Sequence, residues 1–298
     1  MTTAVLLSAH GTVDHLDELP AFLAKIRRGR PTPQSILDEV RHRFELIGGS
    51  PLLRITREVA AALQARLGLP VVVGMRLWTP TLTSALAEAA AHGATRIVSI
   101  PLAPQSTHVY HQALQEAVQE RVAAGHAAPE LVLAPAWGEE PLLLDAFSEA
   151  IDDGLTRFDA AVRDRVPVVL TAHSLPRRVI AMGDPYEQQF RAMAEAVIAR
   201  RGEAARLHVA FQSQGMDGGE WLGPDLPTTF RTLAAAGHHE VLVAAIGFVS
   251  DHVETLYDLD IEAHTLAEAA GLRLQRAPSL NTRPRYLDAL EAVARRLL

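Results

Sequence analysis

Short runs rich in Val, Ile and Leu alternate along the chain with longer Ala-rich segments in which apolar residues recur at helical spacing. This alternation predicts β-strands joined by crossover helices, because strands covered on both faces are almost wholly apolar. The strands are expected near residues 4–9, 70–75, 96–101, 131–135, 167–172, 207–211 and 240–245. The carboxyl ends of such parallel strands open onto loops, where ligands usually bind.

The two halves of the chain contain similar motifs in the same order. Leu6–Thr12 is similar to Val169–Leu175, and Ser106–Val109 is similar to Ser250–Val253. Between these motifs, each half has a tryptophan and a proline followed by an Ala-rich helical segment. An internal repeat of this kind indicates one supersecondary arrangement used twice.

The repeat predicts an α/β fold of two similar Rossmann-like domains, each a parallel sheet flanked by helices, with a ligand cleft between them. We expect the domains at residues 1–140 and 141–298. The last helix, about residues 284–298, could pack on either domain. With 298 residues, of which 48% are hydrophobic, the chain is long enough for two cores.

Composition narrows the possible functions. A net charge of −7 argues against a broad nucleic-acid or anionic-membrane surface. The absence of cysteine excludes disulfides, thiolate zinc sites and a cysteine-ligated iron–sulfur cluster, so any metal must meet nitrogen or oxygen ligands. No targeting segment is recognisable and no run approaches the ~20 apolar residues of a membrane span, so a cytoplasmic location is expected. No exposed apolar helix requires a dimer, and a monomer is expected.

Two histidines, His10 and His173, follow buried strands at equivalent positions of the repeat. A histidine at a strand end is often only a hydrogen-bonded structural residue, but its recurrence in both halves favours a function. A neutral imidazole accepts a proton near pH 7 or ligates a metal.

The densest polar cluster runs from Gly247 to Glu262. If this segment is helical from about Val253, then Glu254, Asp258 and Glu262 form a carboxylate stripe about 12 Å long. An acidic solvated face is the ordinary interpretation of such a run. The neighbouring strand end favours a path for a hydrated divalent cation, because hard oxygen ligands suit such ions.

A basic run containing Arg27 and Arg28 could bind carboxylates bidentately or could be a solvated loop. The turn at Gly48–Pro51, which includes Ser50, could offer backbone amides to an anion.

These motifs resemble the ferrochelatase family from about Leu6 to the C-terminal helix. Thr171–Pro176 and Gly183–Tyr186 are similar to the family's Ser-Ala-His-Ser-Leu-Pro and Gly-Asp-Pro-Tyr signature, and Gly247–Asp258 is similar to its second signature. Other segments look most like the monomeric Gram-positive-type branch, whose substrate is coproporphyrin III; these are the arginine run, Glu45–Pro51 and Leu102–Pro104.

The resemblance implies a chelatase that inserts ferrous iron into a porphyrin in haem biosynthesis, with iron as substrate and no required prosthetic group. His173 would accept pyrrole protons and Glu254 would share in proton removal or metal delivery, while Asp258 and Glu262 would line the metal's approach. His173, Glu254 and His10 are also candidate metal ligands. The expected porphyrin-binding residues are His10, Arg27, Arg28, Arg43, Ser50, Arg76, Ser106, Thr107 and Tyr110.

At some positions this chain has a different residue from the one expected in that branch. His10 stands where a tyrosine is expected after the first strand, so the axial contact to product iron could be imidazole. Phe44 replaces a propionate-binding tyrosine, Phe211 replaces a tryptophan, and the loop after Pro104 is shorter. Coproporphyrin III is therefore favoured with protoporphyrin IX possible.

Two other functions are considered. Ala9-His10-Gly11 also fits a sirohydrochlorin chelatase that uses cobalt, nickel or iron. A non-catalytic haem or porphyrin carrier would bind the macrocycle without metalation.

Overall fold

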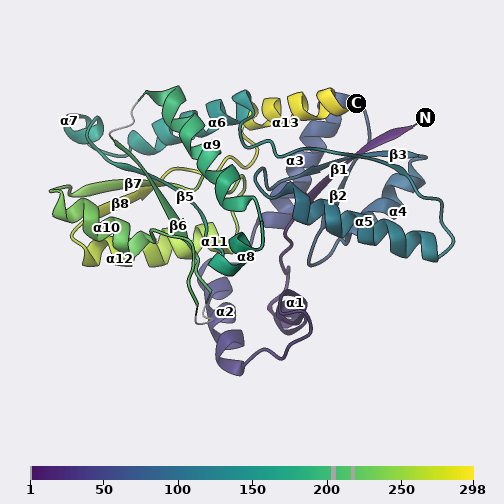
Figure 1. Cartoon of the computed structure of the whole chain (residues 1–298), viewed down its shortest axis with the longest axis horizontal. Coiled ribbons are helices and arrows are strands. Elements are labelled where there is room, and N and C mark those ends of the chain that lie inside the picture. Colours follow the sequence, from purple (N-terminus) through teal and green to yellow (C-terminus); the bar gives the residue numbers. More distant parts are fainter. Residues whose placement is uncertain (1, 203–205, 216–218) are drawn as a thin grey trace. The chain divides into compact units, whose positions relative to one another are not determined.

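The computed structural model describes residues 2–202, 206–215 and 219–298, and the chain divides into two compact units (Figure 1). Unit 1 comprises Met1–Trp137 together with Asn281–Leu298, and unit 2 comprises Gly138–Leu280. The last helix, whose domain the sequence left open, therefore belongs to unit 1.

Unit 1 is built on a four-stranded parallel sheet of order β2-β1-β3-β4. Its strands are β1 (Thr3–Ala9), β2 (Val71–Met75), β3 (Arg96–Pro101) and β4 (Glu130–Leu133). All but the first residue of β1 are buried, which is what its run of apolar side chains requires for a central strand. The predicted strands of this half are therefore confirmed.

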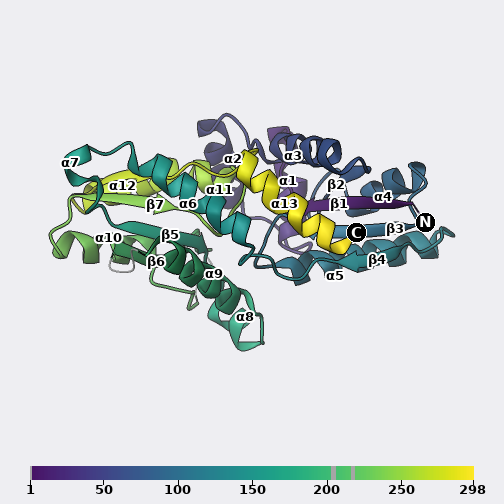
Figure 2. The same ribbon diagram turned by 90° about the horizontal axis from the view of Figure 1, so that it is seen from above.

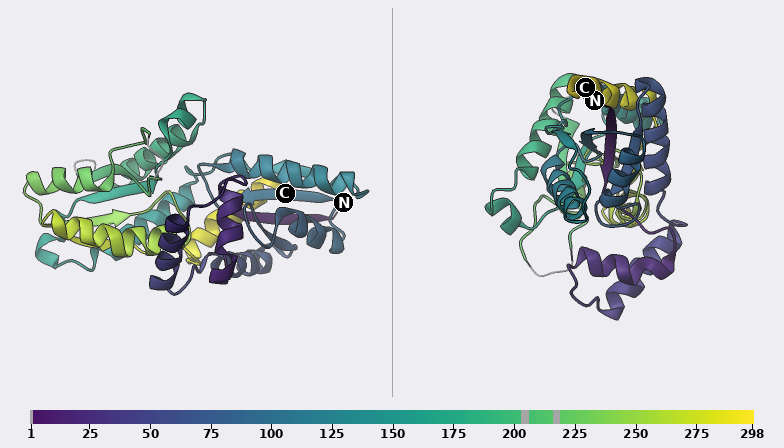
Figure 3. Two further views of the ribbon diagram at one scale, coloured as in Figure 1. Left: turned by 90° about the horizontal axis from the view of Figure 1, so that it is seen from below. Right: turned by 90° about the vertical axis from the view of Figure 1, so that its right-hand side faces the viewer.

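Helices cover both faces of this sheet. On one face, α4 (Leu82–Ala91) and α5 (Thr107–Ala123) form an apolar core with β1, β2 and β3. On the other, α13 (Pro284–Leu297) packs against α3 (Leu52–Leu67), where Arg66 contacts Asp288 at 2.7 Å (Figure 2). The short η1 (Leu16–Glu18) leads into α1 (Leu19–Ile26), which contacts α2 (Gln34–Leu46); these two helices project from the unit (Figure 3, right).

Unit 2 repeats the same strand order. Its parallel sheet is β6-β5-β7-β8, so β5 takes the central place that β1 holds in unit 1. The strands are β5 (Val168–His173), β6 (Leu207–Gln212), β7 (Glu240–Ala244) and β8 (Arg273–Arg276). The sequence did not predict β8, because Arg-Leu-Gln-Arg is polar; it is an edge strand with only Leu274 buried.

The sheet of unit 2 also lies between two helical layers. α10 (Leu226–Ala235) and α12 (Ala263–Ala269) lie side by side on one face (Figure 3, left), and α6 (Pro141–Leu155) and α9 (Tyr186–Arg201) cover the other. The described part of the unit also contains three short α-helices, α7 (Ala160–Arg163), α8 (Arg177–Ala181) and α11 (Val253–Leu256). Two similar parallel sheets flanked by helices confirm the predicted α/β fold.

The tryptophan–proline match of the repeat corresponds to matching local structure. Met75 N–H of β2 donates to the Pro80 carbonyl, and Phe211 N–H of β6 donates to the Pro224 carbonyl. The next residue then caps a helix in each unit: Thr81 Oγ1 accepts from Ser84 N and Asp225 from Thr228 N. The same turn therefore connects the second strand to its helix in both units.

Among the described residues, no helix combines the length and the apolar character needed to cross a bilayer.

Gly247 allows a close approach of two segments beside the end of β5. Its N–H donates to the Thr171 carbonyl at 2.9 Å, and an added Cβ would lie 2.4 Å from Ala172 Cβ and 2.7 Å from Ala172 Cα. Such a clash must move backbone, because Ala172 has no flexible side chain to yield.

Gly247→Ala is therefore expected to lower the free energy of unfolding by about 1–3 kcal/mol, the usual cost of overpacking. Chemical denaturation measures this change. The control is Gly219→Ala, where the nearest atom to the new Cβ is a guanidinium nitrogen of Arg178 at 3.7 Å. Equal unfolding midpoints for the two variants would contradict the expectation.

Candidate active site

His173 is the last residue of β5, where the sheet ends and the side chain leaves the core. Its Nδ1 lies 2.5 Å from the Ser174 carbonyl oxygen, and Tyr186 Oη donates to the His173 carbonyl at 2.8 Å. A carbonyl oxygen only accepts, so Nδ1 carries the proton and donates. Nε2 is then the nitrogen that can gain and lose a proton toward the site.

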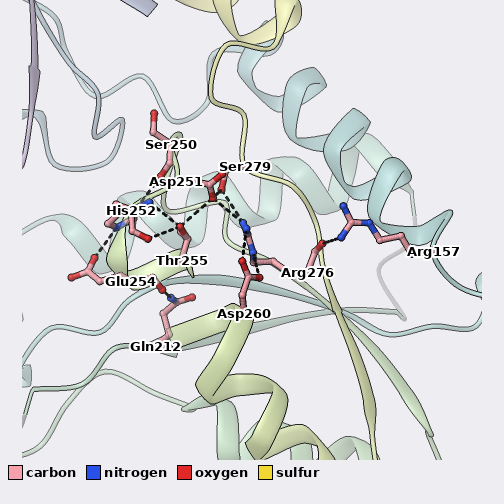
Figure 4. Close-up of polar contacts among 10 residues, drawn as sticks. All are labelled: Arg157, Gln212, Ser250, Asp251, His252, Glu254, Thr255, Asp260, Arg276 and Ser279. Carbon is pink, nitrogen blue, oxygen red and sulfur yellow. Dashed lines mark hydrogen bonds and ion pairs between the residues drawn. The ribbon is translucent and has the colours of Figure 1, made fainter. Parts of the chain in front are cut away.

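Glu254 contacts two imidazoles. Its Oε1 is 3.4 Å from His173 Nε2. Its Oε2 is 2.9 Å from Nε2 of His252, whose Nδ1 lies 2.9 Å from the Ser250 carbonyl (Figure 4). The structure thus brings together the two residues proposed as catalytic from the sequence. It adds His252, which the repeat had marked only as the partner of His108.

Each member of this pair shifts the pKa of the other in the direction that favours the charged form. Burial lowers the pKa of His173, but the charge and hydrogen bond of Glu254 outweigh burial and raise the pKa above its ordinary value. Burial raises the pKa of Glu254, but His173 and His252 outweigh that effect and lower the pKa well below its ordinary value. Both side chains remain about one-third exposed, at 31% and 33%, so solvent can reach the pair.

The predicted carboxylate stripe is wrong in its local geometry. The segment is not one α-helix: α11 ends at Leu256, and a π-helical turn, η3 (Asp258–Glu262), precedes α12. A π turn changes the angular spacing of side chains, and such turns are frequent at functional sites. Asp258 is buried and accepts a hydrogen bond from Ser213 Oγ, whereas Glu262 is exposed.

No group of three or more His, Asp or Glu side chains within residues 2–202, 206–215 and 219–298 is arranged to hold a metal ion. The metal-ligand roles expected for His173, Glu254, Asp258, Glu262 and His10 therefore stay predictions.

The end of β6 supplies two residues that the sequence analysis did not place in the site. Gln212 is buried, accepts from Thr171 Oγ1 at 2.6 Å and donates through Nε2 to the Glu254 carbonyl at 3.1 Å. Ser213 has a φ of 59°, unusual for a residue with a side chain, and it holds Asp258. Both residues directly follow the strand predicted at residues 207–211, and this position at a strand end was the sequence signal that could have marked them as site residues.

Four expected porphyrin-binding residues lie on or beside the α1–α2 pair of unit 1. Arg27 follows α1 and donates through Nε to the Pro31 carbonyl, and Arg28 has a left-handed φ of 55°. Arg43 in α2 contacts Glu39 at 2.9 Å. Ser50, in the turn after α2, has a buried Oγ without a hydrogen-bond partner in the described part of the chain.

The remaining five lie near the carboxyl ends of β1, β2 and β3. His10 is exposed after β1, and Arg76 follows β2 with its N–H donating to the Ala9 carbonyl. Ser106, Thr107 and Tyr110 begin α5 after β3, and the latter two are buried. These nine residues are in unit 1, whereas His173 and Glu254 are in unit 2.

Comparisons with known proteins agree with these motifs. The family profile described as Ferrochelatase matches residues 2–298. A protein named ferrochelatase from Acidobacterium capsulatum is 37% identical, covering 98% of this chain and 93% of its own length. A coproporphyrin III ferrochelatase from Anoxybacillus flavithermus is 32% identical, covering 97% and 94%.

A solved structure, SirB from Bacillus subtilis with Fe3+, has a TM-score of 0.63 at 14% identity and covers 100% of this chain and 96% of its own. That likeness shows the fold alone.

The shifts at the His173–Glu254 pair define a pH interval. The ion pair requires an ionised Glu254 and a protonated His173. Because the pKa of Glu254 is lowered and that of His173 is raised, the stabilisation is lost as pH falls through the Glu254 pKa and as pH rises through the His173 pKa. The pair therefore stabilises the fold between these two values.

Glu254→Gln removes the charge but keeps the burial, so the His173 pKa is expected to fall below its ordinary value. NMR titration of the imidazole C–H resonances measures this directly. His111, whose pKa is lowered by burial in unit 1, serves as the unaffected reference. An unchanged His173 pKa would show that Glu254 does not control it.

Proposed function

The chain belongs to the ferrochelatase family, and from that premise we propose that it inserts ferrous iron into coproporphyrin III in haem biosynthesis, with protoporphyrin IX as the alternative porphyrin. The observation that carries the assignment is the contact between His173 and Glu254 at the carboxyl end of the unit 2 sheet. Relatives at 31–32% identity are named coproporphyrin III ferrochelatases, which supports the choice of porphyrin.

Iron insertion requires groups that remove protons from the macrocycle. The free porphyrin carries two pyrrole N–H protons, and both must leave as the divalent ion enters, so the charge of the macrocycle is conserved. In the proposal, unprotonated His173 takes one pyrrole proton at Nε2, and its raised pKa makes it a stronger base than an ordinary imidazole. Glu254 shares in removing the second proton, which passes to the solvent that reaches the pair. Because Nδ1 donates to the Ser174 carbonyl, the basic lone pair is directed away from that carbonyl.

Glu254 supports this step in two ways. Its negative charge stabilises the imidazolium that forms on His173, an electrostatic contribution already in place before the reaction. Its second oxygen contacts His252 Nε2 at 2.9 Å, which helps to hold the carboxylate in place. Asp258 lies one turn beyond Glu254, and its carboxylate is a suitable oxygen ligand for incoming iron.

The remaining assignments are also proposals. Arg27, Arg28, Arg43 and Ser50 would bind propionates, because guanidinium groups pair bidentately with carboxylates. The protein would act in the cytoplasm as a monomer and would need no prosthetic group, since iron is its substrate. The structural likeness to SirB does not favour sirohydrochlorin, because at 14% identity it supports only a common fold.

His173→Ala is expected to keep porphyrin binding and to lower the rate of metalation by at least about 100-fold, the effect of removing a general base. Purified protein is incubated anaerobically with ferrous iron and either coproporphyrin III or protoporphyrin IX, and initial rates are compared with porphyrin affinities. His264→Ala, at an exposed position of α12, is the control. Near-normal turnover without His173 would refute its role, and porphyrin binding without metalation by the unaltered protein would favour a carrier.

His10→Phe is expected to change the optical and resonance Raman spectra of the iron–porphyrin product complex, because an imidazole ligand would be lost from iron. The exposed position of His10 after β1 leaves the side chain outside the core, so the fold should tolerate the change. Spectra identical to those of the unaltered protein would rule out ligation by His10.

A further inference from the structure

Arg276, the last residue of β8, is a largely buried cation that joins three polar groups. Its side chain is 10% exposed. Nε and Nη2 donate to the two carboxylate oxygens of Asp260 at 2.6 and 2.9 Å, and Nη1 donates to Asp251 at 3.2 Å and to Ser279 Oγ at 3.0 Å (Figure 4). A charge this far from solvent is tolerated only when it is paired in this way.

The two carboxylates bound by Arg276 lie on opposite sides of Glu254 in the chain. Asp251 is in the loop before α11, and Asp260 is inside the π turn after it. The irregular segment between them has only one short α-helical turn of its own. A single guanidinium therefore ties both ends of this segment to β8.

Hydrogen bonds continue from Asp251 toward the reactive pair. Thr255 Oγ1 donates to Asp251 Oδ1 at 3.2 Å and accepts from the His252 N–H at 3.0 Å. His252 in turn contacts Glu254 through its ring nitrogen. The path from Arg276 to the Glu254 carboxylate is continuous in Figure 4.

Resting on the proposed function, we infer that Arg276 is a positioning residue for iron insertion, which holds the turn carrying Glu254 in the orientation that meets His173. It does not touch the reacting atoms. It acts by fixing Asp251 and Asp260, and through them the backbone on either side of Glu254.

The arrangement also separates the charges of an acidic segment. Carboxylates at 251, 254, 258 and 260 repel one another over this short distance. Arg276 offsets the charges of Asp251 and Asp260, while Glu254 contacts His173 and His252 and Asp258 accepts from Ser213. Without Arg276, this guanidinium would no longer offset the charges of Asp251 and Asp260, and their repulsion with Glu254 would favour a displaced turn.

The same strand provides a matched control. Arg273 also makes a two-nitrogen contact with one carboxylate, Glu240, at 3.2 and 2.6 Å. Its side chain is 52% exposed, and the carboxylate that it contacts belongs to β7 and not to the turn at residues 251–260. Replacing it removes an ion pair from β8 without affecting the turn.

The test compares Arg276→Met, Arg276→Lys and Arg273→Met in the full-length protein. Arg276→Met is expected to lower kcat at least about tenfold while porphyrin affinity stays within about twofold, because small misplacement of a catalytic group is costly. Arg276→Lys should be intermediate, since an ammonium keeps the charge but cannot pair bidentately with Asp260. Arg273→Met should have the same kcat and the same porphyrin affinity as the unaltered protein.

Stability is measured alongside by thermal unfolding, with assays at a temperature where every variant is folded. If Arg276→Met does not fold, Arg276→Lys and Asp260→Asn provide the test, because each weakens the contact with Asp260 while Asp251 keeps a cationic partner at position 276. Loss of stability with an unchanged kcat in these two variants would overturn the positioning role and leave a structural one.

A second readout does not depend on turnover. Imidazole nitrogen and proton resonances of His173 and His252 should shift in Arg276→Lys and stay unchanged in Arg273→Met. Shifted resonances in a protein that fails to metalate either porphyrin would count against the proposed function only. Unchanged resonances and unchanged kcat in an active protein would overturn the inference about Arg276.

Discussion

The proposed active site depends on one contact, that between the Glu254 carboxylate and the His173 imidazole. The two residues are distant in sequence and belong to different segments at the carboxyl end of one sheet. They meet because β5 and β7 are hydrogen-bonded neighbours and because Gly247 lets the chain after β7 press against Ala172. Charge of opposite sign in a partly buried setting then raises the proton affinity of His173 and keeps Glu254 ionised.

The duplicated scaffold is used for different tasks in the two units. When the sequences of the two repeats are aligned, His10 corresponds to His173 and Tyr110 corresponds to Glu254. In unit 1 the corresponding segment is a regular helix of 17 residues, α5, whereas in unit 2 it is a single short turn followed by the π turn. On this strand order, unit 2 forms an imidazole–carboxylate pair at the end of its central strand, in keeping with the general finding that function lies in sites built onto a fold.

The irregular backbone around Glu254 is stabilised from outside the segment itself. Gln212 holds the Glu254 carbonyl from β6, Ser213 holds Asp258, and Arg276 holds Asp260 from β8. Each of these is a polar group at or near a strand end that faces the same turn. A carboxylate-rich turn can adopt a non-α geometry here because its partners are placed by the sheet and not by local helix propensity.

The sequence alone predicted the strands of both sheets except β8, the repeat, and His173 and Glu254 as candidate catalytic residues, which the structure places in contact. Apolar runs and a repeated strand-end histidine are local signals, and burial in a parallel sheet leaves little freedom in how they are used. Tertiary structure decided the rest. The polar strand β8 forms because β7 offers a hydrogen-bonding edge. The carboxylates at 254, 258 and 262 do not have the expected α-helical spacing, because a π turn includes residues 258–262. Gln212, His252 and Arg276 join the site for the same reason: their roles arise from contacts between separate strand ends, which no local pattern of residues contains.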